Sequence, residues 1–191
     1  MLTLFQRKNF KHMNGLSLFS SAGIGETYLE QIGVNIIVAN ELIERRANLH
    51  NKLYPNCNCI CGDITDNKVF RDVIEASRGV EFLLASPPCQ GMSWIGKNKH
   101  QEEYIKDPRN YLINSVFDAI EQLKPSYVMI ENVEKLLVFK MPYKDGLHTL
   151  SNMRITQTIA QHICLKKFLR KDLICSMMWK HIELVVQGIL T

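Results

Sequence analysis

The chain has 191 residues and a formal net charge of +4, a size that suggests one domain able to bury a substantial core. Hydrophobic residues make up 46% and charged residues 22% of it. These values are ordinary for globular proteins and argue against disorder, collagen and coiled coil. The small excess of basic residues permits an anionic partner such as nucleic acid but does not require one.

Six cysteines are too few for a disulfide scaffold at this length, so reduced thiols in a cytoplasmic protein are the simplest interpretation. Cys57, Cys59 and Cys61 alternate, which would place all three on one face of a strand. Zinc is an alternative, but this spacing differs from the C-x-x-C of zinc ribbons, and we predict no metal site.

Neither end of the chain has the pattern of a membrane segment. Residues 1–15 lack the continuous apolar core of a signal peptide. The apolar segment 173–190 is interrupted by Lys180, His181 and Glu183, which makes it too polar for a membrane span. We therefore predict a cytoplasmic protein without a membrane partner.

Short apolar runs alternate with segments of helical spacing along the first 130 residues. In chain order, the runs that predict strands lie at residues 16–20, 34–39, 59–60, 80–85 and 127–130. The helical segments lie between them, at residues 26–32, 42–53, 69–74 and 111–123, and Gly33 is a favourable stop for the first. This alternation predicts an α/β fold with a mostly parallel sheet built from right-handed βαβ units. After about Phe139 it ceases, and only residues 150–169 retain some helical character.

Polar signals follow each of the five predicted strands, where an open parallel sheet binds its ligands. They are a glycine turn at residues 21–25, Glu41, Asp63, the segment 87–90 and the pair Glu131 and Asn132. Each signal alone is weak, since a glycine turn is usually only a turn and a lone acid is usually solvated. Five such signals at five successive strand ends indicate a binding site.

The first three signals favour a nucleoside. Gly23 and Gly25 let the backbone approach a ligand closely. A carboxylate such as Glu41 accepts hydrogen bonds from both ribose hydroxyls, and Asp63 suits the exocyclic amine of adenine. A dinucleotide is disfavoured, because Tyr28 stands where G-x-G-x-x-G has its third glycine.

The last two signals favour covalent chemistry. Cys89 carries a nucleophilic thiol in a loop whose backbone Pro87 and Pro88 restrict. Glu131 ends a strongly apolar strand, where burial would favour the protonated acid. The alternatives are an inert buried cysteine and a surface acid that caps the next helix.

These residues lie in segments that closely resemble the cytosine-5 DNA methyltransferases. The segments occur in the family's order and at compatible spacings. They are LSLFSSAGIGE (16–26), NELIERR (40–46), GDI (62–64), SPPCQGMSW (86–94), DPRNYL (107–112) and ENVEKLL (131–137). The resemblance covers about two-thirds of the chain and implies a Rossmann-like S-adenosylmethionine-dependent methyltransferase fold, incomplete on its C-terminal side.

The resemblance implies S-adenosyl-L-methionine as cofactor. By position, Phe19 stacks near the adenine, the turn from Ser20 through Gly23 to Gly25 passes the methionine part, and Glu41 holds the ribose. Leu42 and Ile64 flank the adenine, and Asp63 binds its amine. Pro87 completes the implied cofactor-binding set.

The resemblance also implies catalytic roles for Cys89, which would attack C6 of cytosine, and Glu131, which would hydrogen-bond or protonate N3. The partner is double-stranded DNA with the target cytosine flipped out of the stack. Substrate or DNA contacts are expected from Gln90, Ser93, Asn132 and Arg109. The loop after Cys89 is the expected lid, with cations at Lys97, Lys99, His100 and Lys106 that would meet phosphates.

The sequence departs from the family pattern in two ways. Ser21 stands where many members have glycine, which restricts the turn. The later family motifs, including the target-recognition domain, are not found. Asn152-Met153-Arg154-Ile155-Thr156-Gln157 has the letters of a polar motif without the pattern. The expected organisation is an extension over residues 1–15, a partial cofactor-binding and catalytic domain over 16–139 and a basic tail over 140–191.

Three hypotheses follow. The chain is a truncated catalytic portion of a DNA cytosine-5 methyltransferase, expected from a bacterial restriction–modification system. Alternatively, it is one subunit of a split enzyme whose second polypeptide supplies target recognition, or it is an inactive remnant. A tRNA cytosine-5 methyltransferase is a weaker alternative. We expect little or no methyltransferase activity from the isolated chain, because no target-recognition domain is found in it.

Overall fold

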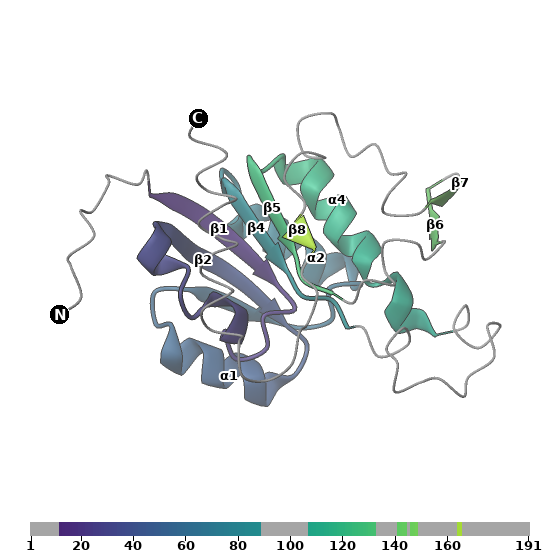
Figure 1. Ribbon diagram of the computed structural model, residues 1–191. Coiled ribbons are helices and arrows are strands. Elements are labelled where there is room, and N and C mark those ends of the chain that lie inside the picture. Colours follow the sequence, from purple (N-terminus) through teal and green to yellow (C-terminus); the bar gives the residue numbers. More distant parts are fainter. Residues whose placement is uncertain (1–11, 89–106, 133–140, 145, 149–163, 166–191) are drawn as a thin grey trace, which may run out of the picture. The chain divides into compact units, whose positions relative to one another are not determined.

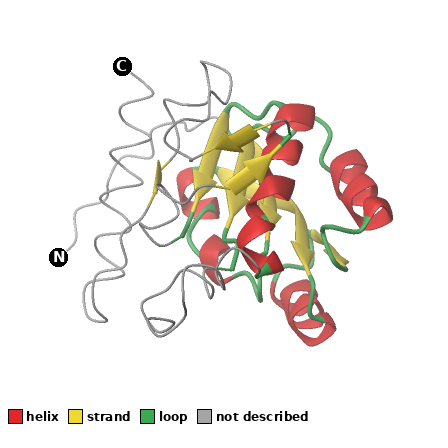
Figure 2. Ribbon diagram, turned by 90° about the vertical axis from the view of Figure 1, so that its right-hand side faces the viewer, coloured by secondary structure: helices red, strands yellow, loops and turns green. Residues whose placement is uncertain are grey.

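The computed structural model describes residues 12–88, 107–132, 141–144, 146–148 and 164–165. The chain divides into two compact units, which are described separately. The first comprises the described residues of Met1–Ala85 and Asp118–Ser126, and the second those of Ser86–Phe117 and Tyr127–Thr191. Figure 2 distinguishes the described helices and strands by colour.

The first unit contains a parallel sheet of strands in the order β3-β2-β1-β4. The strands are β1 (Met13–Leu18), β2 (Val34–Glu41), β3 (Asn58–Cys61) and β4 (Phe82–Ala85), and β1, β2 and β4 are visible side by side in Figure 1. These are the apolar runs of the sequence, and their buried side chains form the core, with Leu16, Leu18, Val38, Ala39, Leu83 and Ala85 among them. The predicted α/β class with a parallel sheet is confirmed.

Two α-helices of the first unit contact β2 and β3. They are α1 (Glu44–Leu53) and α2 (Asn67–Ala76). Helix α2 begins where the Asp66 side chain accepts hydrogen bonds from the backbone N–H groups of Lys68 and Val69, a typical N-cap. Helix α1 presents Ala47 and His50 to the interior and leaves Leu49 and Leu53 exposed.

The helix predicted over residues 26–32 is replaced by two short 3-10 helices, η1 (Ile24–Glu26) and η2 (Glu30–Ile32). The Thr27 hydroxyl donates to the carbonyls of Gly23 and Ile24, and such side-chain bonds compete with a continuous helix. The predicted stop at Gly33 is correct, because this residue caps η2 with a left-handed φ of 84°.

The second unit contains strand β5 (Tyr127–Ile130), which pairs in parallel with β8 (Cys164–Leu165). A hairpin of β6 (Met141–Tyr143) and β7 (Gly146–His148) has no counterpart in the sequence prediction. The 3-10 helix η4 (Pro108–Tyr111) precedes α4 (Ile113–Leu123), which matches the predicted helix over 111–123 and belongs to the first unit from Asp118 onward. Strand β8 falls within the segment 150–169, where helical character was expected, so that expectation is wrong at these two residues.

Cys57 precedes strand β3, so the three cysteines do not lie together in one strand; Cys57 and Cys59 are buried, whereas Cys61 is exposed. Strand β3 begins only at Asn58 and ends at Cys61, where the chain turns at Gly62. All three are free thiols. Across the part of the chain that the structure describes, there is no metal-ligand cluster and no helix long and apolar enough to cross a bilayer.

Candidate active site

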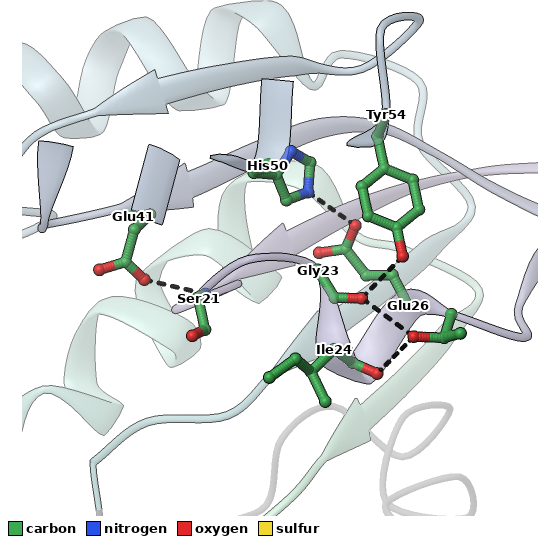
Figure 3. Close-up of polar contacts among 8 residues, drawn as sticks. Ser21, Gly23, Ile24, Glu26, Glu41, His50 and Tyr54 are labelled. Atoms are coloured by element: carbon green, nitrogen blue, oxygen red, sulfur yellow. Dashed lines mark hydrogen bonds and ion pairs between the residues drawn. The ribbon is translucent and has the colours of Figure 1, made fainter. Parts of the chain in front are cut away.

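In the first unit, the turn after β1 is built from residues 19–26 and is called here the glycine turn (Figure 3). Phe19 and Ser21 have positive φ angles of 58° and 57°, which are uncommon for residues with a side chain. Gly23 has a φ of 79°. Backbone hydrogen bonds from Gly23 to Ser20 and from Glu26 to Gly23 close the turn.

Glu41, at the carboxyl end of β2, fixes one side of the glycine turn. Its Oε2 accepts a hydrogen bond from the Ser21 N–H at 2.8 Å, and its Oε1 accepts one from the Ile43 N–H at 2.9 Å. The residue is 6% exposed. Each carboxylate oxygen retains a further lone pair, so the buried acid is held in one orientation and can still accept bonds from a ligand.

Asn40 links the end of β2 to the segment that carries Asp63. Its buried side-chain amide donates to the carbonyls of Ile60 and Gly62, at 3.0 and 3.1 Å. The Gly62 N–H donates in turn to the Glu41 carbonyl. No role for Asn40 was predicted from the sequence, although its place beside the predicted acid at a strand end was the available signal.

The predicted adenine-binding residues differ in accessibility. Asp63 is exposed, and its Oδ1 accepts from the Thr65 N–H and hydroxyl, at 2.9 and 2.8 Å. Leu42 is 63% exposed. Ile64 is 3% exposed and lies in the core. Leu42 therefore offers a ligand more apolar surface than Ile64 does.

Gly23 is required by its neighbour as well as by its φ. A Cβ atom built there would lie 2.2 Å from Cε2 of Tyr54. The Tyr54 hydroxyl donates to the Gly23 carbonyl at 2.9 Å, so the ring lies directly against the glycine turn (Figure 3). The predicted reason for this glycine was close approach of a ligand, and the structure adds a packing reason.

Beneath the turn, Glu26 and His50 form a buried ion pair, with 2.8 Å between Oε2 and Nε2. Burial alone would lower the pKa of His50, but the neighbouring Cys59 thiol and the Glu26 carboxylate outweigh burial and raise it to about 9. Burial, together with Glu26 and Cys59, raises the pKa of the Cys57 thiol to about 12. The pair is not predictable from the sequence, because 24 residues separate its members and no short motif contains both.

In the second unit, the segment before Cys89 is tied to the segment after β5. The Asn132 side chain is 4% exposed and donates to the Pro87 carbonyl at 2.9 Å, across 45 residues of sequence. Pro87 is itself buried, and Glu131 is half-buried next to Asn132. The bond brings the fourth and fifth predicted signals together. Cys89, Gln90, Ser93 and the cations of the expected lid lie outside the described residues.

Arg109 is held by Asp107. Its guanidinium forms an ion pair with that carboxylate at 2.6 Å, and its backbone N–H donates to the same side chain at the start of η4. An expected DNA contact from Arg109 would therefore come from a cation that is already paired.

A parallel α/β sheet with a buried acid and a glycine turn at its strand ends is typical of α/β proteins that bind a ligand at this edge of the sheet. A model of the C-5 cytosine-specific DNA methylases matches residues 13–154. The chain belongs to that family.

Two curated relatives are named Type II methyltransferases. M1.HgaI of Avibacterium volantium is 50% identical over 145 residues, which are 75% of this chain and 41% of that protein. M.XorII of Xanthomonas oryzae is 30% identical over 129 residues, 66% of this chain and 29% of that protein. The chain thus spans less than half the length of either relative.

The fold is similar to that of a crystal structure of an E. coli prophage protein assigned to the DNA modification methyltransferases. The TM-score is 0.50 at 22% identity, over 63% of this chain and 32% of the other. At that identity the likeness supports the fold alone, and it agrees with the expected methyltransferase fold.

Proposed function

We propose that the chain provides the cofactor-binding and catalytic part of a DNA cytosine-5 methyltransferase of the restriction–modification type. The observation that carries the proposal is the hydrogen bond from Asn132 to Pro87, because it joins the segment of the expected acid to that of the expected nucleophile. Family membership over residues 13–154 supports it, since the match includes every candidate site residue.

The first unit fits the proposed cofactor, S-adenosyl-L-methionine. Glu41 is buried and oriented by two backbone N–H groups, as an acceptor for ribose hydroxyls should be. Leu42 offers an exposed apolar side chain to the adenine, and Asp63 offers an exposed carboxylate to its exocyclic amine. The turn from Phe19 to Gly25 would follow the methionine part. When bound, the cofactor supplies an electrophilic methyl group.

The second unit would supply the chemistry on the base. The Cys89 thiolate would bond to C6 of a flipped cytosine, while Glu131 donates a proton or hydrogen bond to N3 and stabilises the electrons displaced into the ring. C5 would thereby become nucleophilic and would accept the methyl group, whose bond to sulfur breaks and leaves S-adenosylhomocysteine. Loss of the C5 proton then expels the Cys89 thiolate and restores the aromatic ring as 5-methylcytosine.

DNA would be the partner, with Gln90, Ser93 and Arg109 as proposed contacts. Base flipping is required because neither C5 nor C6 is open to attack within a stacked duplex, and it costs a few kcal/mol. The mild net charge of +4 is consistent with a chain that leaves most of the DNA contact to another part of the enzyme.

Covalent trapping tests this function. The full chain would be mixed with S-adenosylmethionine, the unmatched part of M1.HgaI as a separate polypeptide, and a randomised duplex in which 5-fluorocytosine replaces cytosine. Fluorine at C5 prevents the final elimination, so we expect a stable protein–DNA adduct that disappears in Cys89→Ser.

Cys61→Ser is the matched control, because Cys61 is an exposed thiol at the end of β3. It should retain the adduct. An adduct that persists in Cys89→Ser, or none with the wild-type mixture, would contradict the proposed chemistry.

A further inference from the structure

Three side chains outside the expected cofactor-binding set hold the glycine turn, namely those of Glu26, His50 and Tyr54. Tyr54 donates to the Gly23 carbonyl, His50 pairs with Glu26 at the end of the turn, and the rings of His50 and Tyr54 are 4.9 Å apart. His50 and Tyr54 lie one helical turn apart at the end of α1, where the Tyr54 N–H donates to the His50 carbonyl. Figure 3 shows these groups converging on the turn.

The buried Glu26–His50 ion pair carries a large desolvation free energy for a contact that is only structural. The side chains of His50 and Glu26 are 0% and 2% exposed, and Oε1 of Glu26 has no hydrogen-bond partner among the described residues. Removing two charges from water costs free energy that a single hydrogen bond does not fully recover, and apolar replacements of such pairs are often neutral or stabilising. Because Glu26 is the last residue of the glycine turn, the pair is placed to set the geometry of that turn.

The turn needs such support. Phe19 and Ser21 adopt left-handed conformations that are strained for residues with a Cβ atom, and strained backbone persists only where its surroundings impose it. Glu41 restrains the turn at the Ser21 N–H, Tyr54 at the Gly23 carbonyl and His50 at the Glu26 carboxylate. Glu41 is shared with the proposed ribose contact, whereas His50 and Tyr54 are outside the proposed cofactor-binding set.

We propose that Glu26, His50 and Tyr54 are positioning residues that hold the glycine turn in the shape that receives the nucleoside cofactor. This inference rests on the proposed function. Tyr54 acts through the Gly23 carbonyl, and His50 acts through the Glu26 carboxylate. The end of α1 thus restrains the glycine turn, which is the proposed cofactor-binding turn.

Amide hydrogen exchange on the cofactor-free full chain tests whether these residues hold the glycine turn. In Glu26→Gln and in Tyr54→Phe, the amides of residues 20–26 should exchange about tenfold faster, the effect of losing about one hydrogen bond. The amides of β1 and β4 should be unchanged. Val73→Ala, at a fully buried position of α2, is the control that weakens packing without touching the turn.

Calorimetric titration with S-adenosylmethionine completes the test. We expect the dissociation constant to rise about tenfold in Glu26→Gln and Tyr54→Phe and to stay constant in Val73→Ala. Unchanged exchange in the turn, acceleration spread evenly over the first unit, or a looser turn with unchanged affinity would each overturn the inference. Failure of the wild-type chain to bind the cofactor would refute the proposed function instead, and exchange in the cofactor-free chain would still decide whether these residues hold the turn.

Discussion

Ser21 occupies a left-handed conformation in the glycine turn although it carries a side chain, with a φ of 57°. Its N–H bond to Glu41 holds it there. The left-handed φ favours glycine, which many family members have at this position. In this chain the serine is accommodated with local backbone strain. That strain lies in the turn we propose for the cofactor.

Replacing Ser21 tests this strain. Ser21→Gly should leave the free energy of unfolding unchanged or raise it by up to about 1 kcal/mol, because relief of strain exceeds or offsets the added entropy of the unfolded chain. Ser21→Val should lower it by about 1–2 kcal/mol, since a β-branched residue tolerates positive φ poorly. Urea denaturation measures both, and a glycine variant less stable than the valine variant would refute the explanation.

Asn132 was expected to contact substrate, but its amide is buried and bound to the Pro87 carbonyl. In Asn132→Asp the shape is kept and the donor is lost, so a carboxylate would face a carbonyl oxygen. We expect the free energy of unfolding to fall by about 1–3 kcal/mol and adduct formation on 5-fluorocytosine DNA to slow markedly. Asn35→Asp, the same change at an exposed position of β2, should alter neither. An Asn132→Asp variant with normal trapping would show that the bond does not position the Cys89 segment.

At the scale of elements, the strands were predictable because each is a short apolar run whose side chains become core, as Leu83 and Val38 do. The positions of the polar residues after the strands were predictable as well, because each apolar run shows where its strand ends. The helix over 26–32 was not, because Thr27 bonds locally to the turn. The β6–β7 hairpin was missed because strands of three residues carry too little pattern.

The Glu26–His50 pair could not have been predicted from local pattern, since α1 and η1 meet only in the folded chain. His50 reads in the sequence as one polar residue on an amphipathic helix. Its burial and its partner depend on the packing of α1 against the glycine turn, where Tyr54 and Cys59 also lie close to it. Residue spacing within one element contains no such information.

This pair predicts a pH dependence of stability. The pKa of His50 is raised from about 6.5 in the unfolded chain to about 9 in the folded one. Its contribution is therefore fully present below about pH 6.5 and is lost as the pH rises through about 9. Of the groups that act on the ring, Glu26 is the anionic partner and Cys59 is the neighbouring thiol.

Thermal unfolding from pH 6 to pH 10 measures this effect. The midpoint of the wild type should fall more steeply over this range than that of His50→Gln, which lacks the titrating ring. Other groups that titrate near pH 10 are common to both proteins and cancel in the difference. Parallel curves for the two proteins would contradict the raised pKa.

For the whole molecule, composition alone suggested a complete domain, whereas the comparisons show that the chain spans 41% of M1.HgaI and 29% of M.XorII. The family assignment was predictable because its motifs are short and contiguous. Cofactor, catalytic cysteine and DNA partner remain proposals for this chain. Their support comes from family membership and from the bonds that orient Glu41 and Asn132.

Calorimetric titration of the full chain with S-adenosylmethionine tests the central claim most directly. We predict saturable binding of one cofactor per chain, weakened at least about tenfold in Glu41→Gln, where an NH₂ group would face one of the backbone N–H donors. Lys68→Ala, on the exposed surface of α2, should bind as the wild type does. Absence of saturable binding, or equal affinity in Glu41→Gln, would contradict the account.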